Sequence, residues 1–220
     1  MPAIFPRWTN NIPIAAGLLA PLVGVTLIFS VWYWFSPSYT DVGYRPKQPV
    51  PYSHRLHVGE LGLDCRYCHN TVENSAVAAI PPAATCMNCH ETAVKADSQR
   101  LAPVREAYNK GEPGGKPVEW VRVHQLPDYA YFAHSPHVAA GVGCASCHGR
   151  VDKMVVVEMD QPMSMGWCLD CHRDPTPNLR PLDEVTNMDW TPAEQAYDPA
   201  RDPERQRQVN PPLHCSGCHR

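Results

Sequence analysis

Outside its apolar amino-terminal stretch, the sequence has few long hydrophobic runs, and 24 of its 220 residues are proline. A chain of this kind builds only a modest hydrophobic core and little regular secondary structure. It also lacks a run of basic residues, and its pI is near 6.4, so nothing in it favours binding to nucleic acid. None of its ten cysteines lies outside one repeated motif, which leaves no thiol for a disulfide or for catalysis.

That motif is the pentad Cys-x-x-Cys-His, which occurs five times. It is the attachment signature of c-type haem: two thiols add to the haem vinyl groups and the histidine becomes the proximal iron ligand. Zinc sites also use Cys-x-x-Cys, but in pairs and with no need of a following histidine. We therefore predict five covalent c-type haems. The attachment residues are Cys65, Cys68, Cys86, Cys89, Cys144, Cys147, Cys168, Cys171, Cys215 and Cys218, and the proximal ligands are His69, His90, His148, His172 and His219.

Two His-x-x-His pairs precede pentads in the same way. Each pair follows an aromatic residue by two positions, Tyr52 in one case and Phe132 in the other, and a pentad begins six or seven residues after each pair. This internal repeat predicts two similarly built units with two haems each. A six-coordinate iron needs a second, distal ligand. The predicted distal ligands are His54, His57, His124, His134 and His137, with His214, Met154 and Met165 as less favoured candidates.

No charged residue lies between Arg7 and Asp41, and residues 12–35 form an apolar segment long enough to cross a hydrocarbon core of about 30 Å. Tryptophan and tyrosine residues flank this segment, as they do at membrane interfaces. A cleaved signal peptide has a shorter apolar region and a small-residue cleavage site, whereas this segment ends in bulky aromatics. We therefore predict a retained single-pass anchor in the lipid of the cytoplasmic (inner) membrane. Because haem is attached on the outer side, the pentads should lie on the periplasmic side.

These features divide the chain into segments. We expect a cytoplasmic amino terminus and anchor in residues 1–36, a tether in 37–51, a first dihaem unit with a linker in 52–123, a second dihaem unit in 124–172, and a proline-rich arm with the fifth haem site in 173–220. The expected fold is a mostly irregular and α-helical multihaem cytochrome c with one amino-terminal transmembrane helix and little sheet. The apolar macrocycles would replace much of the missing core, as metals do in other small scaffolds.

Nearly the whole chain resembles a known family, the membrane-anchored pentahaem cytochrome c subunit of bacterial alternative complex III, a quinol oxidoreductase of the respiratory chain. The resemblance lies in the single anchor, the five pentads and three runs: Tyr52-Ser53-His54 through Cys65, Val123-His124-Gln125-Leu126-Pro127-Asp128-Tyr129, and Met165-Gly166-Trp167-Cys168. It implies an electron-transfer subunit that does not itself convert the substrate. The implied partners are quinol-oxidising integral membrane subunits, an iron–sulfur subunit and a monohaem cytochrome c.

An alternative is a single-anchor multihaem quinol dehydrogenase that feeds a periplasmic reductase. Chains of that type carry four pentads and oxidise quinol at the haem nearest the membrane. The fifth pentad and the long proline-rich segment before it weigh against this alternative.

Overall fold

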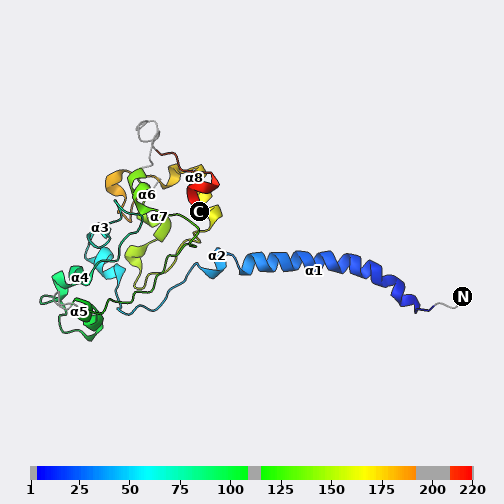
Figure 1. The fold of residues 1–220 in the computed structure, drawn as a ribbon, viewed down its shortest axis with the longest axis horizontal. Helices are drawn as coiled ribbons and strands as arrows, with labels where there is room; N and C mark the ends of the chain where they lie inside the picture. The colour runs from blue at the N-terminus through cyan, green and yellow to red at the C-terminus, as the bar shows by residue number, and fades with distance from the viewer. Residues whose placement is uncertain (1–3, 109–114, 192–208, 220) are drawn as a thin grey trace. The chain divides into compact units, whose positions relative to one another are not determined.

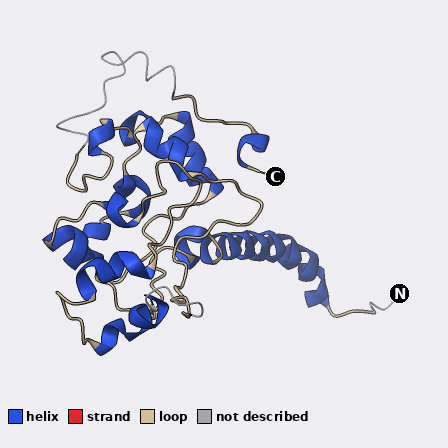
Figure 2. Ribbon diagram, turned by 60° about the vertical axis from the view of Figure 1, so that its left-hand side comes forward, coloured by secondary structure: helices blue, strands red, loops and turns tan. Residues whose placement is uncertain are grey.

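The computed structural model describes residues 4–108, 115–191 and 209–219. All regular structure within these ranges is helical (Figures 1 and 2). Strand-like pairing there is limited to two isolated antiparallel bridges, Ala130 with His219 and Val142 with Leu179. The expectation of a mostly helical and irregular fold is therefore confirmed.

The chain divides into two compact units, Met1–Val42 and Gly43–Arg220. The proline-rich arm predicted for residues 173–220 belongs to the second unit, and its residues 192–208 lie outside the described part of the chain.

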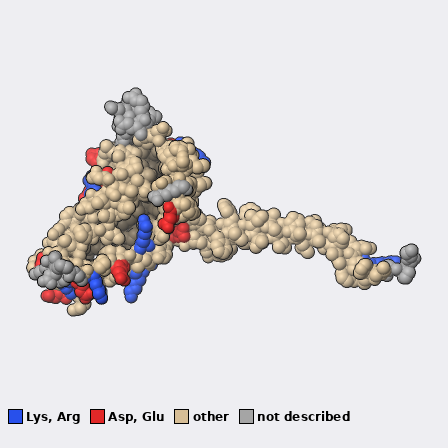
Figure 3. All heavy atoms as spheres, viewed as in Figure 1, with Lys and Arg blue, Asp and Glu red and all other residues tan. Residues whose placement is uncertain are grey.

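The first unit consists of a 3₁₀ turn η1 (Arg7–Asn11), the long helix α1 (Ile12–Trp34) and a short helix α2 (Pro37–Thr40). The 23 residues of α1 give it a length of about 35 Å. The hydroxyl of Thr26 donates to the carbonyl of Leu22 at 2.8 Å, so this polar group is satisfied within the helix. Figure 3 shows no charged side chain along α1. With a mean hydropathy of 2.3 over its most apolar window, this helix is long and apolar enough to cross a membrane.

The second unit contains two successive groups of short helices. The first group is a π-helical turn η2 (Arg55–Glu60), α3 (Cys65–Cys68), α4 (Ala83–His90), η3 (Gln99–Leu101) and α5 (Ala102–Tyr108). The second group is α6 (His134–Ala140), α7 (Cys144–His148), η5 (Val151–Lys153), α8 (Met165–Arg173), η6 (Thr176–Asn178), η7 (Leu182–Glu184) and, near the carboxyl terminus, α11 (Cys215–Cys218).

Each pentad forms a helical turn, and two of these helices have side-chain caps. The Asp64 carboxylate accepts from the backbone N–H of Arg66 at 2.8 Å and caps α3, while the Ser164 hydroxyl accepts from the N–H of Trp167 at 3.2 Å and caps α8. Such caps satisfy amide groups that have no partner within the helix. They fix where the helix begins, and so fix the direction in which the two cysteines of the pentad project.

The protein's own hydrophobic core is small. Val50, Met87 and Val104 form a buried cluster that joins the tether to α4 and α5, with Tyr108 and Trp120 packed against it. In the described residues only four other hydrophobic side chains are buried: Met159, Leu179, Val185 and Trp190. This agrees with the modest core expected from the composition.

A buried arginine fastens the segment after α8 to the third pentad. The guanidinium of Arg180 lies 4.6 Å above the ring of Trp190 and donates to the carbonyl of Asn187 at 2.8 Å. The same segment accepts a hydrogen bond at the carbonyl of Val185 from the N–H of Cys144, at 3.1 Å. The start of α7 is therefore held by a segment about forty residues further along the chain.

The core cluster leads to a prediction about stability. Val104→Ala should lower the free energy of unfolding by about 1–3 kcal/mol, because Val104 is only 2% exposed and the substitution leaves a cavity beneath α4. Val155→Ala, at a half-exposed position, is the control and should change this free energy much less. Guanidinium denaturation of the two variants measures the difference, and equal losses would contradict the importance of the cluster.

Candidate haem-binding sites

The two His-x-x-His pairs have the same local geometry. The ring of Tyr52 stacks on His57 at 4.4 Å between centroids and meets the edge of His54 at 4.8 Å. Phe132 lies 4.8 Å from both His134 and His137, edge-on to the first and tilted over the second. The aromatic residue two positions before each pair therefore fixes the orientation of both imidazoles.

The predicted proximal histidines of four pentads share one interaction. The Nδ1 atom of each lies near a backbone carbonyl oxygen: His69 near Ala79 at 2.8 Å, His90 near Val94 at 2.7 Å, His172 near Pro212 at 2.9 Å and His219 near Tyr129 at 3.3 Å. An Nδ1–H that donates to a carbonyl fixes the tautomer and leaves Nε2 free as a metal ligand.

Three distal candidates have the same arrangement. Nδ1 of His57 lies 2.8 Å from the carbonyl oxygen of Ser53, and Nδ1 of His137 lies 2.7 Å from that of Ala133. Nδ1 of His134 lies 2.8 Å from the carbonyl oxygen of Ala76, which belongs to the first group of helices. These carbonyl acceptors carry no sequence signal, because every residue type offers one.

Three distal–proximal pairs have the spacing of two imidazoles on one iron. Ligand bonds of about 2 Å on both faces of a metal place the two ring centroids roughly 6 Å apart. The observed separations are 6.3 Å for His57 and His90, 6.3 Å for His134 and His148, and 6.1 Å for His137 and His172. The donor set and its spacing therefore fit haem iron held between two histidines.

His54 occupies in the first His-x-x-His pair the place that His134 occupies in the second. Its Nδ1 is buried and has no hydrogen-bond partner among the described residues, and its Tyr52 contact matches that of His134 with Phe132. Burial, followed by the nearby His69 and His57 rings, lowers the pKa of His54 to about 4. Burial likewise lowers the pKa of His148 to about 3. Both imidazoles are therefore neutral, as a metal ligand must be.

The ten cysteines are all free of disulfides, and thiols of different pentads lie close together. The nearby Cys144 thiol, followed by burial, raises the pKa of Cys65. Burial, followed by the neighbouring Cys86 thiol, raises the pKa of Cys68. The first pentad therefore adjoins both the second and the third.

The fourth pentad adjoins the third and the fifth in the same manner. Burial, followed by the thiols of Cys171 and Cys168, raises the pKa of Cys147 to about 12. Burial, followed by the Cys218 thiol, raises the pKa of Cys168. Every pentad thus has a neighbouring pentad.

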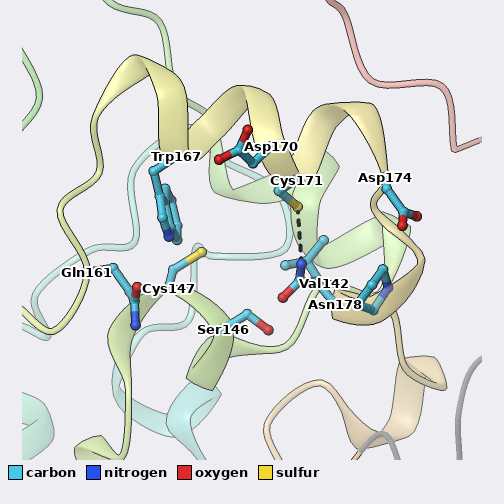
Figure 4. Close-up of a pocket in the computed structure, with 10 residues that line it drawn as sticks. Val142, Ser146, Cys147, Gln161, Trp167, Asp170, Cys171, Asp174 and Asn178 are labelled. Carbon is cyan, nitrogen blue, oxygen red and sulfur yellow. Dashed lines mark hydrogen bonds between the residues drawn. The ribbon is translucent and has the colours of Figure 1, made fainter.

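A cavity of about 450 Å³ lies between α7 and α8. Figure 4 shows Cys147 and Trp167 side by side on one side of it, and Cys171 directed towards Asn178. The Asn178 amide donates to the Cys171 sulfur at 3.5 Å. The volume of this cavity is in the range of cofactor sites, and a cysteine from each of two pentads lines it. The sequence places Trp167 in the run Met165-Gly166-Trp167-Cys168 but does not predict its position in this cavity.

The remaining candidate ligands belong to none of the three ring pairs, although His124 contacts a member of one of them. Nε2 of His124 is 3.4 Å from Nδ1 of His148, with the two rings 4.4 Å apart and nearly perpendicular. His214 is exposed and precedes α11, and Met165 is exposed at the start of α8. Met154 is half-buried, and its carbonyl accepts from the N–H of Arg55.

Comparison with known proteins gives two similarities. Residues 130–220 match the family model described as cytochrome c7 and related cytochrome c. A stretch of 142 residues is 33% identical to the protein named menaquinone reductase, multihaem cytochrome c subunit, of Nitratidesulfovibrio vulgaris (strain Hildenborough). The match covers 63% of this chain and 63% of that relative. Taken with the pentads and the paired imidazoles, these similarities support the interpretation of the chain as a multihaem c-type cytochrome.

Proposed function

We propose that this protein carries five covalent c-type haems and relays electrons from a quinol-oxidising membrane complex to a downstream cytochrome or another periplasmic acceptor. The observation that carries the proposal is the set of three imidazole pairs, each spaced for one iron. The nearness of thiols from different pentads supports irons that lie close to one another. Haem iron supplies one-electron chemistry, and the protein's contribution is to hold each iron beside the next.

The ring pairs support a bis-histidine ligand set for four irons. His57 would complete the iron of His90, His134 that of His148, and His137 that of His172. The internal repeat assigns His54 to the iron of His69. For the fifth iron, bound by His219, the distal candidates are His124, His214, Met154 and Met165.

The nearness of thiols from different pentads supports a linear order of the haems. Numbered by their pentads along the chain, the second adjoins the first, the first adjoins the third, the third adjoins the fourth and the fourth adjoins the fifth. The order 2–1–3–4–5 has two ends, the second and the fifth haem, at which electrons would enter and leave. Partner proteins would therefore bind near α4 or α11.

The proposed partners follow from the family resemblance and the named relative. They are quinol-oxidising integral membrane subunits, an iron–sulfur subunit and a monohaem cytochrome c, as in alternative complex III. The name of the relative, a menaquinone reductase subunit, supports a place beside the quinone pool. Helix α1 would remain as the membrane anchor, with the haem-bearing unit on the periplasmic side.

The sequence of α1 supports a relay that does not oxidise quinol itself. Quinol oxidation needs a proton acceptor near the quinol hydroxyl, and intramembrane ionisable residues are the usual mark of such a site. No charged residue lies between Arg7 and Asp41. Proton handling would therefore fall to a partner subunit, and this chain would move electrons alone.

The haem count is tested by intact-mass measurement of the purified protein. We expect a mass increase equal to five haems, and Cys147→Ala should weaken one attachment while His148→Ala should leave five haems attached with one misligated. A fully matured protein with fewer than five haems would contradict the count.

The distal ligands are tested by substitution of His137. His137→Ala should convert one low-spin iron to high spin, because the sixth position at the iron of His172 is lost. His137→Met is the matched control: it should keep that iron low-spin and raise its reduction potential. Electron paramagnetic resonance and potentiometric titration measure both effects, and an unchanged spin state in His137→Ala would make the pair purely structural.

The division of labour is tested with quinol. The isolated chain in detergent should be reduced by a quinol analogue slowly or not at all, whereas the complete membrane complex should be reduced rapidly. Stopped-flow absorbance of the haems measures both rates. Rapid reduction of the isolated chain would instead support the single-anchor quinol dehydrogenase.

A further inference from the structure

The surroundings of His148 differ from those of the other four proximal histidines. In the other four pentads, Nδ1 faces a backbone carbonyl oxygen. In the third pentad, Nδ1 of His148 instead faces the imidazole nitrogen Nε2 of His124 at 3.4 Å. The third haem lies at the centre of the proposed order, so a change in its potential affects transfer in both directions.

We propose that His124 is a positioning residue for the third haem, whose Nε2 accepts a hydrogen bond from Nδ1–H of the iron ligand His148. This inference rests on the proposed proximal role of His148. It gives His124 a different role from the distal ligation expected from the sequence.

The tautomers follow from the ligation. If Nε2 of His148 binds iron, its Nδ1 carries the hydrogen, and the facing nitrogen must be the acceptor. Nε2 of His124 then carries a lone pair and Nδ1 of His124 carries the hydrogen. The guanidinium of Arg122 donates to the carbonyl of His124 at 3.1 Å and holds its backbone.

The iron bound by His148 would already have its second ligand in His134. His134 lies 6.3 Å from His148 with the two ring planes 6° apart, which is the arrangement of two imidazoles on one iron. His124 lies 4.4 Å from His148 at 87°, too close for an iron between the two rings. His124 therefore contacts the ligand and not the metal of this site.

An imidazole nitrogen is a stronger base than a peptide carbonyl oxygen. As an acceptor it draws the Nδ1 hydrogen of His148 more strongly and makes Nε2 a better electron donor to iron. Partners of this kind tune both the basicity of a metal ligand and the redox potential of the metal. The third haem should therefore have a lower potential than it would with a carbonyl acceptor.

The test uses the full-length holoprotein with His124→Phe and His124→Gln. Phenylalanine fills the space of the ring without an acceptor, whereas the glutamine side-chain carbonyl can accept the hydrogen bond. In His124→Phe we expect all irons that are low-spin in the wild type to remain so, one haem potential to rise, and the resonance signal of one bis-imidazole iron to shift as its ring angle relaxes. His124→Gln should restore the signal and return the potential at least part of the way.

Two outcomes would overturn the proposal. A new high-spin iron in both variants would make His124 an axial ligand, and unchanged potentials and resonance signals in both would make it inert packing. Intact mass of the wild-type protein is measured first, so that failure of the five-haem proposal is distinguished from failure of the role of His124. If His124→Phe does not mature, His124→Gln alone decides, because an axial role predicts a loss of low-spin signal in that variant too.

Discussion

The structure depends most on one interaction, the contact between imidazole Nδ1 and a backbone carbonyl oxygen. It occurs at seven histidines: His57, His69, His90, His134, His137, His172 and His219. A sheet or a long helix uses its own carbonyls in its ladder of hydrogen bonds, whereas turns and loops leave carbonyls free for side chains. A short chain that orients so many imidazoles in this way therefore needs an irregular backbone. The low content of regular structure and the high proline content have the same cause.

The small protein core follows from the same arrangement. Few hydrophobic side chains are buried in the described residues, while many large apolar ones are exposed. A chain with so little apolar burial does not offset the conformational entropy lost on folding by its own contacts. Haem attachment would then supply both the apolar surface and the iron bonds that hold the loops, so that maturation and folding are one process. Local caps such as Asp64 and Ser164 prepare individual pentads for this step.

The sequence predicted the features that are local in the chain. The helical and irregular class, the apolar helix over residues 12–34 and the similarity to multihaem c-type cytochromes are confirmed. The five-haem count and the ligand assignments remain predictions, although the ring spacings support three of the pairings. What the sequence could not provide depends on folding: the carbonyl of Ala76 beside His134, the Cys65–Cys144 contact and the turning of His124 towards His148. A backbone carbonyl is present at every residue, so the sequence does not indicate which one accepts a hydrogen bond. Contacts between distant segments have no characteristic spacing in the sequence.

In the proposed relay, electrons must also pass between the two dihaem units, and the internal repeat does not account for this junction. Contacts within the units occur twice, as Cys68 with Cys86 and as Cys147 with Cys168 and Cys171. The approach of Cys65 to Cys144 occurs once, between the two units. Three interactions surround it. Nδ1 of His134 lies near the Ala76 carbonyl oxygen, the N–H of Cys144 donates to the Val185 carbonyl, and the Thr186 hydroxyl donates to the Asp64 carboxylate at 2.9 Å. In a linear series, the slowest step limits the rate of electron transfer. In the proposed relay, residues 179–190 would therefore contribute to electron transfer without a haem ligand of their own, because they hold the first and third pentads together.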